Sequence, residues 1–253
     1  MRNAIAFSVD SNYLSYAHAL IKSSQSCHVS ADMICRGINL SDDEIMALKG
    51  IDPNITIIRD NVNLNTKKVL MKDLPNPEEL YWTYEGNVYD SIGMKNIMKT
   101  MYSELAVYSC HSRFKTITET LGTDIDTLLC LDADTYINKN IDDLFGKDEC
   151  DMYVVPYGRD RRLFHNEGLL LINNTERSRE FFSRVESEIF SGKTYRGWDI
   201  DTKVLTEVYN DIDINIGMID DTYKDKQHLL ESHMWSGDGP RKDYPTFKRK
   251  VGK

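Results

Sequence analysis

A short apolar strand that ends in two aspartates constrains this chain more than any other feature. Leu128 to Leu131 form an unbroken apolar run, a polar loop precedes the run, and Asp132 and Asp134 follow it. Such a run is typical of a buried β-strand. Ligands of open α/β sheets collect at the carboxyl ends of the strands, so we expect the two carboxylates to lie where such a fold keeps its chemistry.

Asp132 and Asp134 have the chemistry of a site for a hard divalent cation. They are two residues apart on a chain that leaves a strand, so both carboxylates can face one ion. Mg²⁺ or Mn²⁺ would fit, because carboxylates and the phosphates of a substrate complete their coordination shells. The same aspartates could instead simply begin a turn. If they hold a metal as exposed strand-end carboxylates, replacing Asp134 with alanine should remove metal-dependent activity and leave the fold largely intact.

The segments before this motif predict an α/β fold with a parallel, wound sheet. We expect strands at 4–9, 29–35 and 55–59, and helices at about 13–24 and 41–50. Ser41 and Glu44 have the spacing of a capping box at the start of the second helix. Strands that alternate with helices pair in parallel. At 253 residues the chain is long enough for one large α/β domain or for two small ones.

Residues 61–92 interrupt this alternation. Two prolines and an aromatic run indicate an irregular insertion that could act as a lid or as an acceptor wall. Helical spacing returns at 93–108 and 113–121, before the central strand and a short capped helix at 140–145. We further predict strands at 151–156, 168–173 and 212–216, helices at 175–191 and after Asp201, and a polar, basic tail at 234–253.

Charge and cysteine content bear on the class of function. The net charge of −9 argues against nucleic acid or an anionic membrane as the main partner. The basic tail is an exception that could make weak contact with a membrane surface, although a solvated tail also explains it. Five cysteines without a C-x-x-C pair indicate reduced thiols. No signal peptide and no membrane-spanning run of about 18 apolar residues is recognisable, so we expect a cytoplasmic protein.

Several segments resemble family 8 glycosyltransferases, the group that includes glycogenin and the bacterial lipopolysaccharide galactosyltransferases. The order of these segments matches over most of the chain, and Leu131–Thr135 is similar to the D-x-D metal motif of the GT-A fold. The other segments that carry the resemblance are Phe7–Tyr13, Asn166–Asn173, Asp199–Asp201 and the stretch from His233 through Gly237 to Lys242.

The resemblance implies one domain over residues 1–253 with a GT-A fold, which is Rossmann-like and has a mixed, mainly parallel central sheet flanked by helices. It implies a transferase that moves a sugar, with retention of configuration, from a nucleotide-sugar donor to a hydroxyl of a glycan. A UDP-sugar is the expected donor, and Mn²⁺ or Mg²⁺ the expected cofactor. By position, the resemblance assigns the metal to Asp132, Asp134 and His233, the nucleotide and its diphosphate to Asp10, Asn12, Tyr13, Arg113, Ala133 and Lys242, and the donor sugar or acceptor to Asn166, Asp199 and Asp201.

These assignments suit the chemistry that they would serve. A departing nucleoside diphosphate carries concentrated negative charge, which a Lewis-acidic metal and fixed cations stabilise. The sequence departs from the family at Ile200, where many members have a glutamine between two aspartates. An isoleucine can neither attack a sugar nor orient one. This disfavours a double displacement and leaves a front-face attack, with Asp199 orienting the sugar.

Several of the assigned residues also have ordinary structural explanations. Asp10 could cap the helix that follows it, and Asn166 could lie in a turn. His233 could be a surface or core histidine, and Lys242 lies farther from it than is usual in the family. The arginines at positions 159, 161 and 162 could be solvated or could hold an anionic acceptor.

Two other functions fit parts of the pattern. In haloacid dehalogenase-type phosphatases the first motif is also an aspartate pair after an apolar strand, with Asp132 as nucleophile and Asp134 as general acid. Asp220 and Asp221 could then bind Mg²⁺. That motif usually lies on the first strand of its domain, however, and here other strands and helices precede it. The third alternative is a sugar-nucleotide-binding protein without turnover, which Ile200 would suit.

Overall fold

A mixed, mainly parallel sheet forms the centre of the molecule. The computed structural model describes residues 1–70, 73, 83–84, 87–88, 101–156, 168–191, 200–237 and 239–252. In these residues a seven-stranded sheet has the order β12-β10-β11-β8-β1-β2-β3. Its strands are β1 (Asn3–Asp10), β2 (Asp32–Ile38), β3 (Thr56–Asp60), β8 (Thr127–Leu131), β10 (Met152–Val154), β11 (Leu169–Asn173) and β12 (Ile216–Met218). Only β11 runs antiparallel to its neighbours, β8 and β10.

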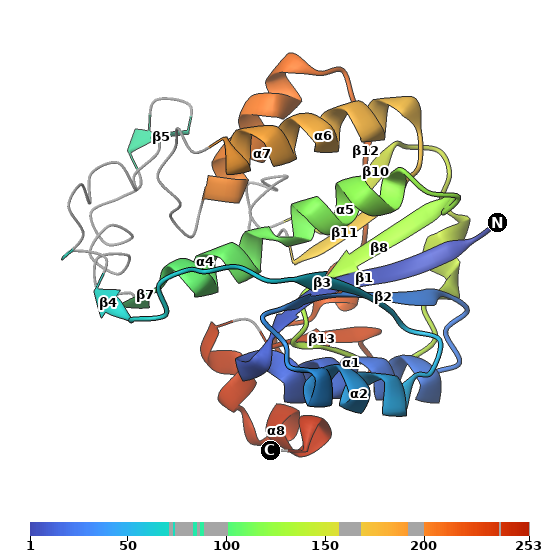
Figure 1. Ribbon diagram of the computed structural model, residues 1–253. Coiled ribbons are helices and arrows are strands. Elements are labelled where there is room, and N and C mark those ends of the chain that lie inside the picture. Colours follow the sequence, from blue (N-terminus) through green and yellow to red (C-terminus); the bar gives the residue numbers. More distant parts are fainter. Residues whose placement is uncertain are drawn as a thin grey trace.

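Helices cover both faces of this sheet (Figure 1). One face carries α5 (Arg113–Leu121), α6 (Glu176–Phe190) and α7 (Ile200–Asp211), with α4 (Glu104–His111) leading into α5. The other face carries α1 (Leu14–Ser26) and α2 (Asp42–Ile51), and α8 (Pro245–Val251) packs against α1. The result is three layers, as predicted for an α/β domain. None of the described helices is long and apolar enough to cross a bilayer.

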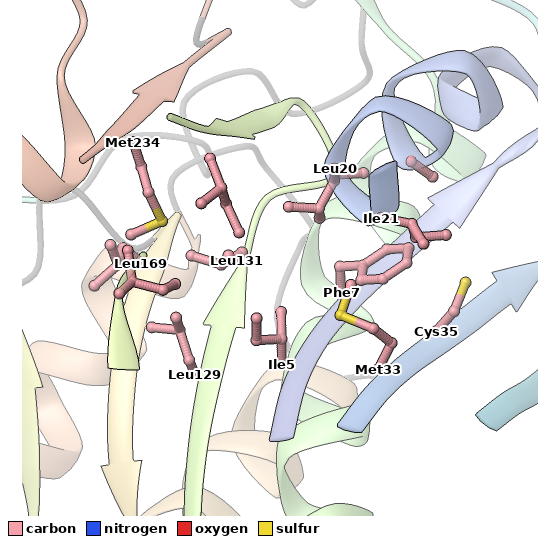
Figure 2. Packing of buried hydrophobic residues seen from close by; sticks show 14 of the residues in the cluster. Ile5, Phe7, Leu20, Ile21, Met33, Cys35, Leu129, Leu131, Leu169 and Met234 are labelled. Atoms are coloured by element: carbon pink, nitrogen blue, oxygen red, sulfur yellow. The ribbon is translucent and has the colours of Figure 1, made fainter. Parts of the chain in front are cut away.

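The central strands are apolar along their whole length because both of their faces are buried. In β1, Ile5 and Phe7 point toward α1 and α2, whereas Ala4 and Ala6 face the α5–α7 layer. Figure 2 shows the first of these clusters, in which Phe7 meets Leu20 and Ile21 of α1. Burying one such large side chain contributes roughly 1.5–3 kcal/mol.

The described residues also form short elements outside the seven-stranded sheet and its covering helices. They are η1 (Ser11–Tyr13), β4 (Val69–Leu70), β5 (Thr83–Tyr84), β6 (Asn87–Val88), β7 (Met101–Tyr102), β9 (Thr135–Ile137), η4 (Asp142–Gly146), η5 (Asp221–Lys224), β13 (Met234–Ser236) and η6 (Gly239–Asp243). β13 pairs with β9, and β4 pairs with β7. The insertion predicted at 61–92 lies partly outside the described residues. Its described stretch 61–68 has no regular secondary structure.

Three predicted elements differ from the structure. Of the helix predicted at 93–108, residues 93–100 lie outside the described residues, while residues 101–102 belong to the strand β7 and α4 begins at Glu104, after its cap at Ser103. The strand predicted at 29–35 is β2 at Asp32–Ile38, because α1 extends to Ser26 and a turn follows. The strand predicted at 212–216 begins where that range ends, because α7 continues to Asp211. Apolar content located these segments, but pairing partners and caps set their ends.

The prediction of a polar tail at 234–253 is wrong. β13 and α8 occupy this segment, and Trp235 and Phe247 are fully buried in it. The basic residues lie around this apolar anchor. Lys248 pairs with Asp243 at 3.0 Å, and the Lys250 ammonium lies 5.2 Å from the centre of the Tyr136 ring. These cations therefore have partners within the molecule, and a contact with a membrane surface stays a prediction.

A buried arginine links β2, β3 and α5, and its removal should destabilise the fold. The Arg36 side chain is 4% exposed, donates to Thr116 Oγ1 at 2.9 Å, and pairs with Asp60 at 3.1 Å and Glu119 at 2.7 Å. Arg36→Met should lower the free energy of unfolding by roughly 3 kcal/mol, because it leaves a largely buried carboxylate without its cation. Urea denaturation measures this loss.

Arg2 provides a matched control for this prediction. It also pairs with two acids, Asp32 and Asp124, but on the surface. Arg2→Met should cost less than about 1 kcal/mol, since exposed ion pairs contribute little. Equal losses in the two variants would contradict the structural role of Arg36.

Candidate active site

The carboxyl ends of β1 and β8 form the candidate site. These two strands are parallel neighbours, and the strand order runs outward from them in opposite directions. Such a switch point is where open α/β sheets bind ligands. Asp10 ends β1, Asp132 follows β8, and Asp134 lies in the turn that leads into β9. The structure thus brings the aspartates of the first and second motifs to one edge of the sheet.

Two cations hold the carboxylate of Asp132. Arg113, the first residue of α5, lies with Nη1 3.0 Å from Asp132 Oδ1. Lys224, the last residue of η5, lies with Nζ 3.8 Å from Oδ2. Burial by itself lowers the pKa of Arg113, but the neighbouring groups together, Asp132 first and Asp201 among them, outweigh burial and raise that pKa well above its ordinary value. Both cations are buried, so the charge of Asp132 is compensated from two sides.

Asp134 is held by the C-terminal segment. Its Oδ2 lies 3.2 Å from Lys242 Nζ, and that ammonium also donates to the Tyr13 hydroxyl at 2.7 Å. The backbone N–H of Gly237 donates to the Asp134 carbonyl at 2.9 Å. The expectation that Asp134 is exposed is wrong: the residue is only 7% exposed, because β13 and η6 cover it. Tyr13, Asp134, Gly237 and Lys242 therefore meet in one place.

The two aspartates fit a hard divalent cation. Burial raises the pKa of Asp134, and the negative charge of Asp132 raises it further, against the opposing effect of Lys242. Two carboxylates that repel each other in this way would both be stabilised by one dication, and their oxygens are the ligands that Mg²⁺ and Mn²⁺ prefer. Ala133 lies buried between them.

His233 is not grouped with the aspartates. Its ring stacks on Tyr223 with centroids 4.2 Å apart, and its Nδ1 lies 3.3 Å from Thr222 Oγ1. Among the residues that the structure describes, three potential metal ligands lie within 4.8 Å of one another at Cys110, His111 and Asp201 alone. The role of His233 as a third ligand stays a prediction.

The residues predicted to hold the nucleotide lie beside the carboxylates. Asp10 Oδ1 accepts from the Asn12 N–H at 2.9 Å, so Asp10 does cap the short helix that follows it. Its second oxygen lies 3.4 Å from the Ser109 hydroxyl of α4. Asn12 and Tyr13 are exposed, with the Tyr13 ring 5.5 Å from that of Tyr16. A contact between these residues and a nucleotide stays a prediction.

Asp201 joins the site through Arg113. It lies in the first turn of α7, with Oδ1 3.8 Å from Nε2 of His111. Arg113 Nη2 lies 3.0 Å from the Cys110 sulfur, so one guanidinium serves both this cluster and Asp132. Burial raises the pKa of Cys110 to about 12, which keeps its thiol neutral. A neutral thiol beside a guanidinium is a poor nucleophile.

The departure at position 200 has a structural explanation. Ile200 is buried with Val204 and Leu205 of α7 in the core beneath α5 and α6. It acts as a packing residue, for which an amide side chain would be poorly suited. Asn166 and Asp199, and the arginine run at 159–162, lie outside the described residues.

Sequence reasoning missed two parts of this site. Lys224 carries no pattern that points to Asp132, since it lies some ninety residues away in sequence. Gly168 lies within the segment 166–173 that resembles the family, and a Cβ there would lie 1.8 Å from Asp132 Oδ2. A glycine just before an apolar strand was the one available signal of a close approach.

Comparisons with known proteins identify the fold. No protein-family model matches the sequence, and no curated protein does. The galactosyltransferase LgtC, solved with donor and acceptor sugar analogs, has a TM-score of 0.59 and 14% identity over 99% of this chain and 95% of that chain. The glycosyltransferase GlyE of Streptococcus pneumoniae has a TM-score of 0.60 and 13% identity, and the match covers 99% of this chain and 60% of GlyE. The bifunctional glycosyltransferase WbbM has a TM-score of 0.60 and 11% identity, and the match covers 100% of this chain and 50% of WbbM.

These structures share the fold of the present chain, and all three are glycosyltransferases. The predicted GT-A fold is therefore confirmed. At identities of 11–14% the likeness extends to the fold alone. Activity and substrates must be argued from the residues of this chain.

Proposed function

We propose that this protein is a metal-dependent glycosyltransferase of the family 8 type. It transfers a sugar from a nucleotide donor, expected to be a UDP-sugar, to a hydroxyl group of a glycan, with retention of configuration. One observation carries the proposal: Asp132 and Asp134 lie at the switch point of a GT-A sheet, each next to a buried or half-buried cation. Solved glycosyltransferases with this fold support it.

The chain's own residues supply most of the machinery for this reaction. Asp132 and Asp134 would hold Mn²⁺ or Mg²⁺, with His233 as the proposed third ligand, and the bound ion would act as a Lewis acid on the diphosphate. Arg113 and Lys242 add fixed positive charge where negative charge develops on the leaving group. Such preorganised charge needs no rearrangement at the moment of reaction.

The remaining assignments complete the donor site. Asp10, Asn12 and Tyr13 line the same edge of the sheet and would contact the nucleoside. Asp201, with Asn166 and Asp199, would orient the donor sugar or the acceptor. Because position 200 is occupied by a buried isoleucine, no nucleophile is proposed there. The acceptor hydroxyl is instead expected to attack on the face from which the diphosphate leaves.

A donor-hydrolysis screen tests the proposal without requiring a known acceptor. The protein is incubated with UDP-glucose, UDP-galactose, UDP-N-acetylglucosamine and GDP-sugars, with Mn²⁺ or with EDTA, and release of nucleoside diphosphate is followed. We expect release from one donor, which EDTA stops. If no donor releases a nucleoside diphosphate and the protein cleaves a simple phosphate ester in a Mg²⁺-dependent way, the phosphatase is favoured. Thermal stabilisation by a nucleotide without turnover would favour a binding protein.

A further inference from the structure

His228 is a buried histidine to which neither the sequence motifs nor the proposed function assigns a role. It lies in the loop between η5 and β13, and the residue is only 6% exposed. Its ring stacks on that of Phe247 with centroids 4.9 Å apart, and the centroid of the Trp235 ring lies 5.4 Å away. A polar ring in such apolar surroundings costs free energy unless it is hydrogen-bonded.

The imidazole of His228 binds one backbone carbonyl group. Its Nε2 lies 2.8 Å from the Ser236 carbonyl oxygen. Since a carbonyl can only accept, Nε2 carries the proton and donates it. Among the residues that the structure describes, Nδ1 has no hydrogen-bond partner. The bond to Ser236 is therefore the polar contact that orients the ring.

The loop around His228 is held in a fixed shape. The φ angle of His228 is +60°, in the left-handed region that residues other than glycine seldom adopt. On either side of it, the backbone N–H groups of Gln227 and Leu229 donate to the carboxylate of Asp225 at 2.6 Å. Asp225 thus fixes the residues that flank His228, and the imidazole is kept over the Ser236 carbonyl.

The peptide between Ser236 and Gly237 connects His228 to Asp134. Its carbonyl accepts from the imidazole, and its N–H, which belongs to Gly237, donates to the Asp134 carbonyl at 2.9 Å. The N–H of Ser236 is also bound, by the Asp225 carbonyl at 2.9 Å. A peptide that is hydrogen-bonded at both of its polar groups cannot turn without breaking one of these bonds. The orientation of the His228 ring and the position of the Asp134 backbone are therefore linked.

This connection depends on a close approach at Gly237. A Cβ at that position would lie 3.0 Å from the Asp134 carbonyl oxygen and 2.9 Å from two carbon atoms of the Phe247 ring. The peptide is thus packed directly between Asp134 and the ring on which His228 stacks. Further along the same segment, Lys242 reaches the Asp134 carboxylate at 3.2 Å. Both the backbone and the side chain of Asp134 therefore depend on where this segment lies.

We propose that His228 is a positioning residue for the metal site. Through the peptide between Ser236 and Gly237 it fixes the backbone of Asp134, and so keeps the Asp134 carboxylate where it can bind the divalent cation. This inference rests on the proposed function, in which Asp134 is a metal ligand. Groups that orient a metal ligand typically contribute roughly ten- to hundredfold to metal affinity.

Two substitutions of His228 separate its hydrogen bond from its packing. His228→Phe keeps an aromatic ring beside Phe247 but has no donor, whereas His228→Gln loses the ring and keeps an N–H at a similar reach. Isothermal titration calorimetry gives the affinity for UDP in the presence of Mn²⁺. His228→Phe should weaken this affinity about tenfold, and His228→Gln should keep it within about threefold of wild type. A role in packing alone predicts the opposite order.

Amide hydrogen exchange, followed by NMR, tests the connection itself without metal or nucleotide. In His228→Phe the Gly237 N–H should exchange at least about tenfold faster than in the wild type, relative to the amides of β1, because the peptide can turn. In His228→Gln its exchange should stay slow. Unchanged exchange at Gly237 in His228→Phe would show that the imidazole does not hold this peptide, and the inference would be wrong.

His28 provides a matched control. It also has a left-handed backbone, with a φ of +54°, but it is exposed. His28→Phe should change neither the affinity for UDP nor the exchange at Gly237. If His228→Phe does not fold by circular dichroism, His228→Leu, which also lacks a donor, replaces it. A folded His228→Gln that loses the affinity for UDP overturns the inference by itself.

The outcome for wild-type protein separates this inference from the proposed function. If the wild type binds neither UDP nor inorganic pyrophosphate in the presence of Mn²⁺, the proposed function fails and the inference fails with it. If the wild type binds UDP and loss of the His228 donor leaves the affinity unchanged, only the role of His228 is overturned.

Discussion

Gly168→Ala should reduce metal-dependent donor turnover about a hundredfold while the protein stays folded. The added methyl group would lie 1.8 Å from Oδ2 and 2.7 Å from Cγ of Asp132, both shorter than the contacts that a Cβ makes in real structures. The backbone of β11 is fixed by its pairing with β8, so the short Asp132 side chain must turn away. It would then leave both the metal position and the Arg113 guanidinium. The donor-hydrolysis assay measures the loss.

Gly146→Ala is the matched control for this variant. Gly146 ends η4, and a Cβ at that position would have no atom within 4 Å. Its turnover should equal that of the wild type. If Gly168→Ala were equally active, Asp132 would not be needed in its present orientation, and the assignment of the metal to this carboxylate would fail.

The centre of the fold could be predicted from sequence because its signals are local. The apolar run before Asp132 is β8, and its burial on both faces leaves no alternation of polar and apolar residues. The Ser41 and Glu44 pattern is a capping box in the structure, with both reciprocal hydrogen bonds present. Motif order then indicated the GT-A fold.

The fold of the C-terminal segment could not be predicted from its composition. Its lysines and arginines suggested a solvated tail, whereas Trp235 and Phe247 anchor it against Tyr16 of α1. A few large apolar side chains stabilise such a segment by several kcal/mol when they are buried. Their partners lie some two hundred residues earlier in the chain, so no local pattern could reveal them.

Only the site residues that belong to sequence motifs could be predicted. Motif positions selected Asp132, Asp134 and Arg113, and these three lie together in the structure, while their roles stay predictions. Lys224 and Gly168 could not be found in this way, because their roles depend on how η5 and β11 approach Asp132 in space. The packing of Ile200 in the core likewise depends on how α7 meets α5 and α6.

Asp134→Asn should weaken the Mn²⁺-dependent binding of UDP at least about a hundredfold. The folded state of the variant should be no less stable than that of the wild type. An amide removes one of the two charges that would attract the cation. The pKa of Asp134 is raised by burial and by the charge of Asp132, so the folded state favours the neutral form more than the unfolded chain does. Asparagine, which resembles the neutral form, avoids the desolvation of a buried charge, and Lys242 keeps its hydrogen bond to the Tyr13 hydroxyl when the ion pair is lost.

Calorimetry with UDP and Mn²⁺ and the midpoint of thermal unfolding without metal measure the two effects of this variant separately. Asp148→Asn removes the same charge from an exposed position and should change neither quantity. A large fall in the unfolding midpoint of Asp134→Asn would show that the ion pair with Lys242 is mainly structural. Unchanged UDP affinity would show that Asp134 is not a metal ligand. Only loss of binding with retained stability identifies a carboxylate that is kept in a buried position for the ion it binds.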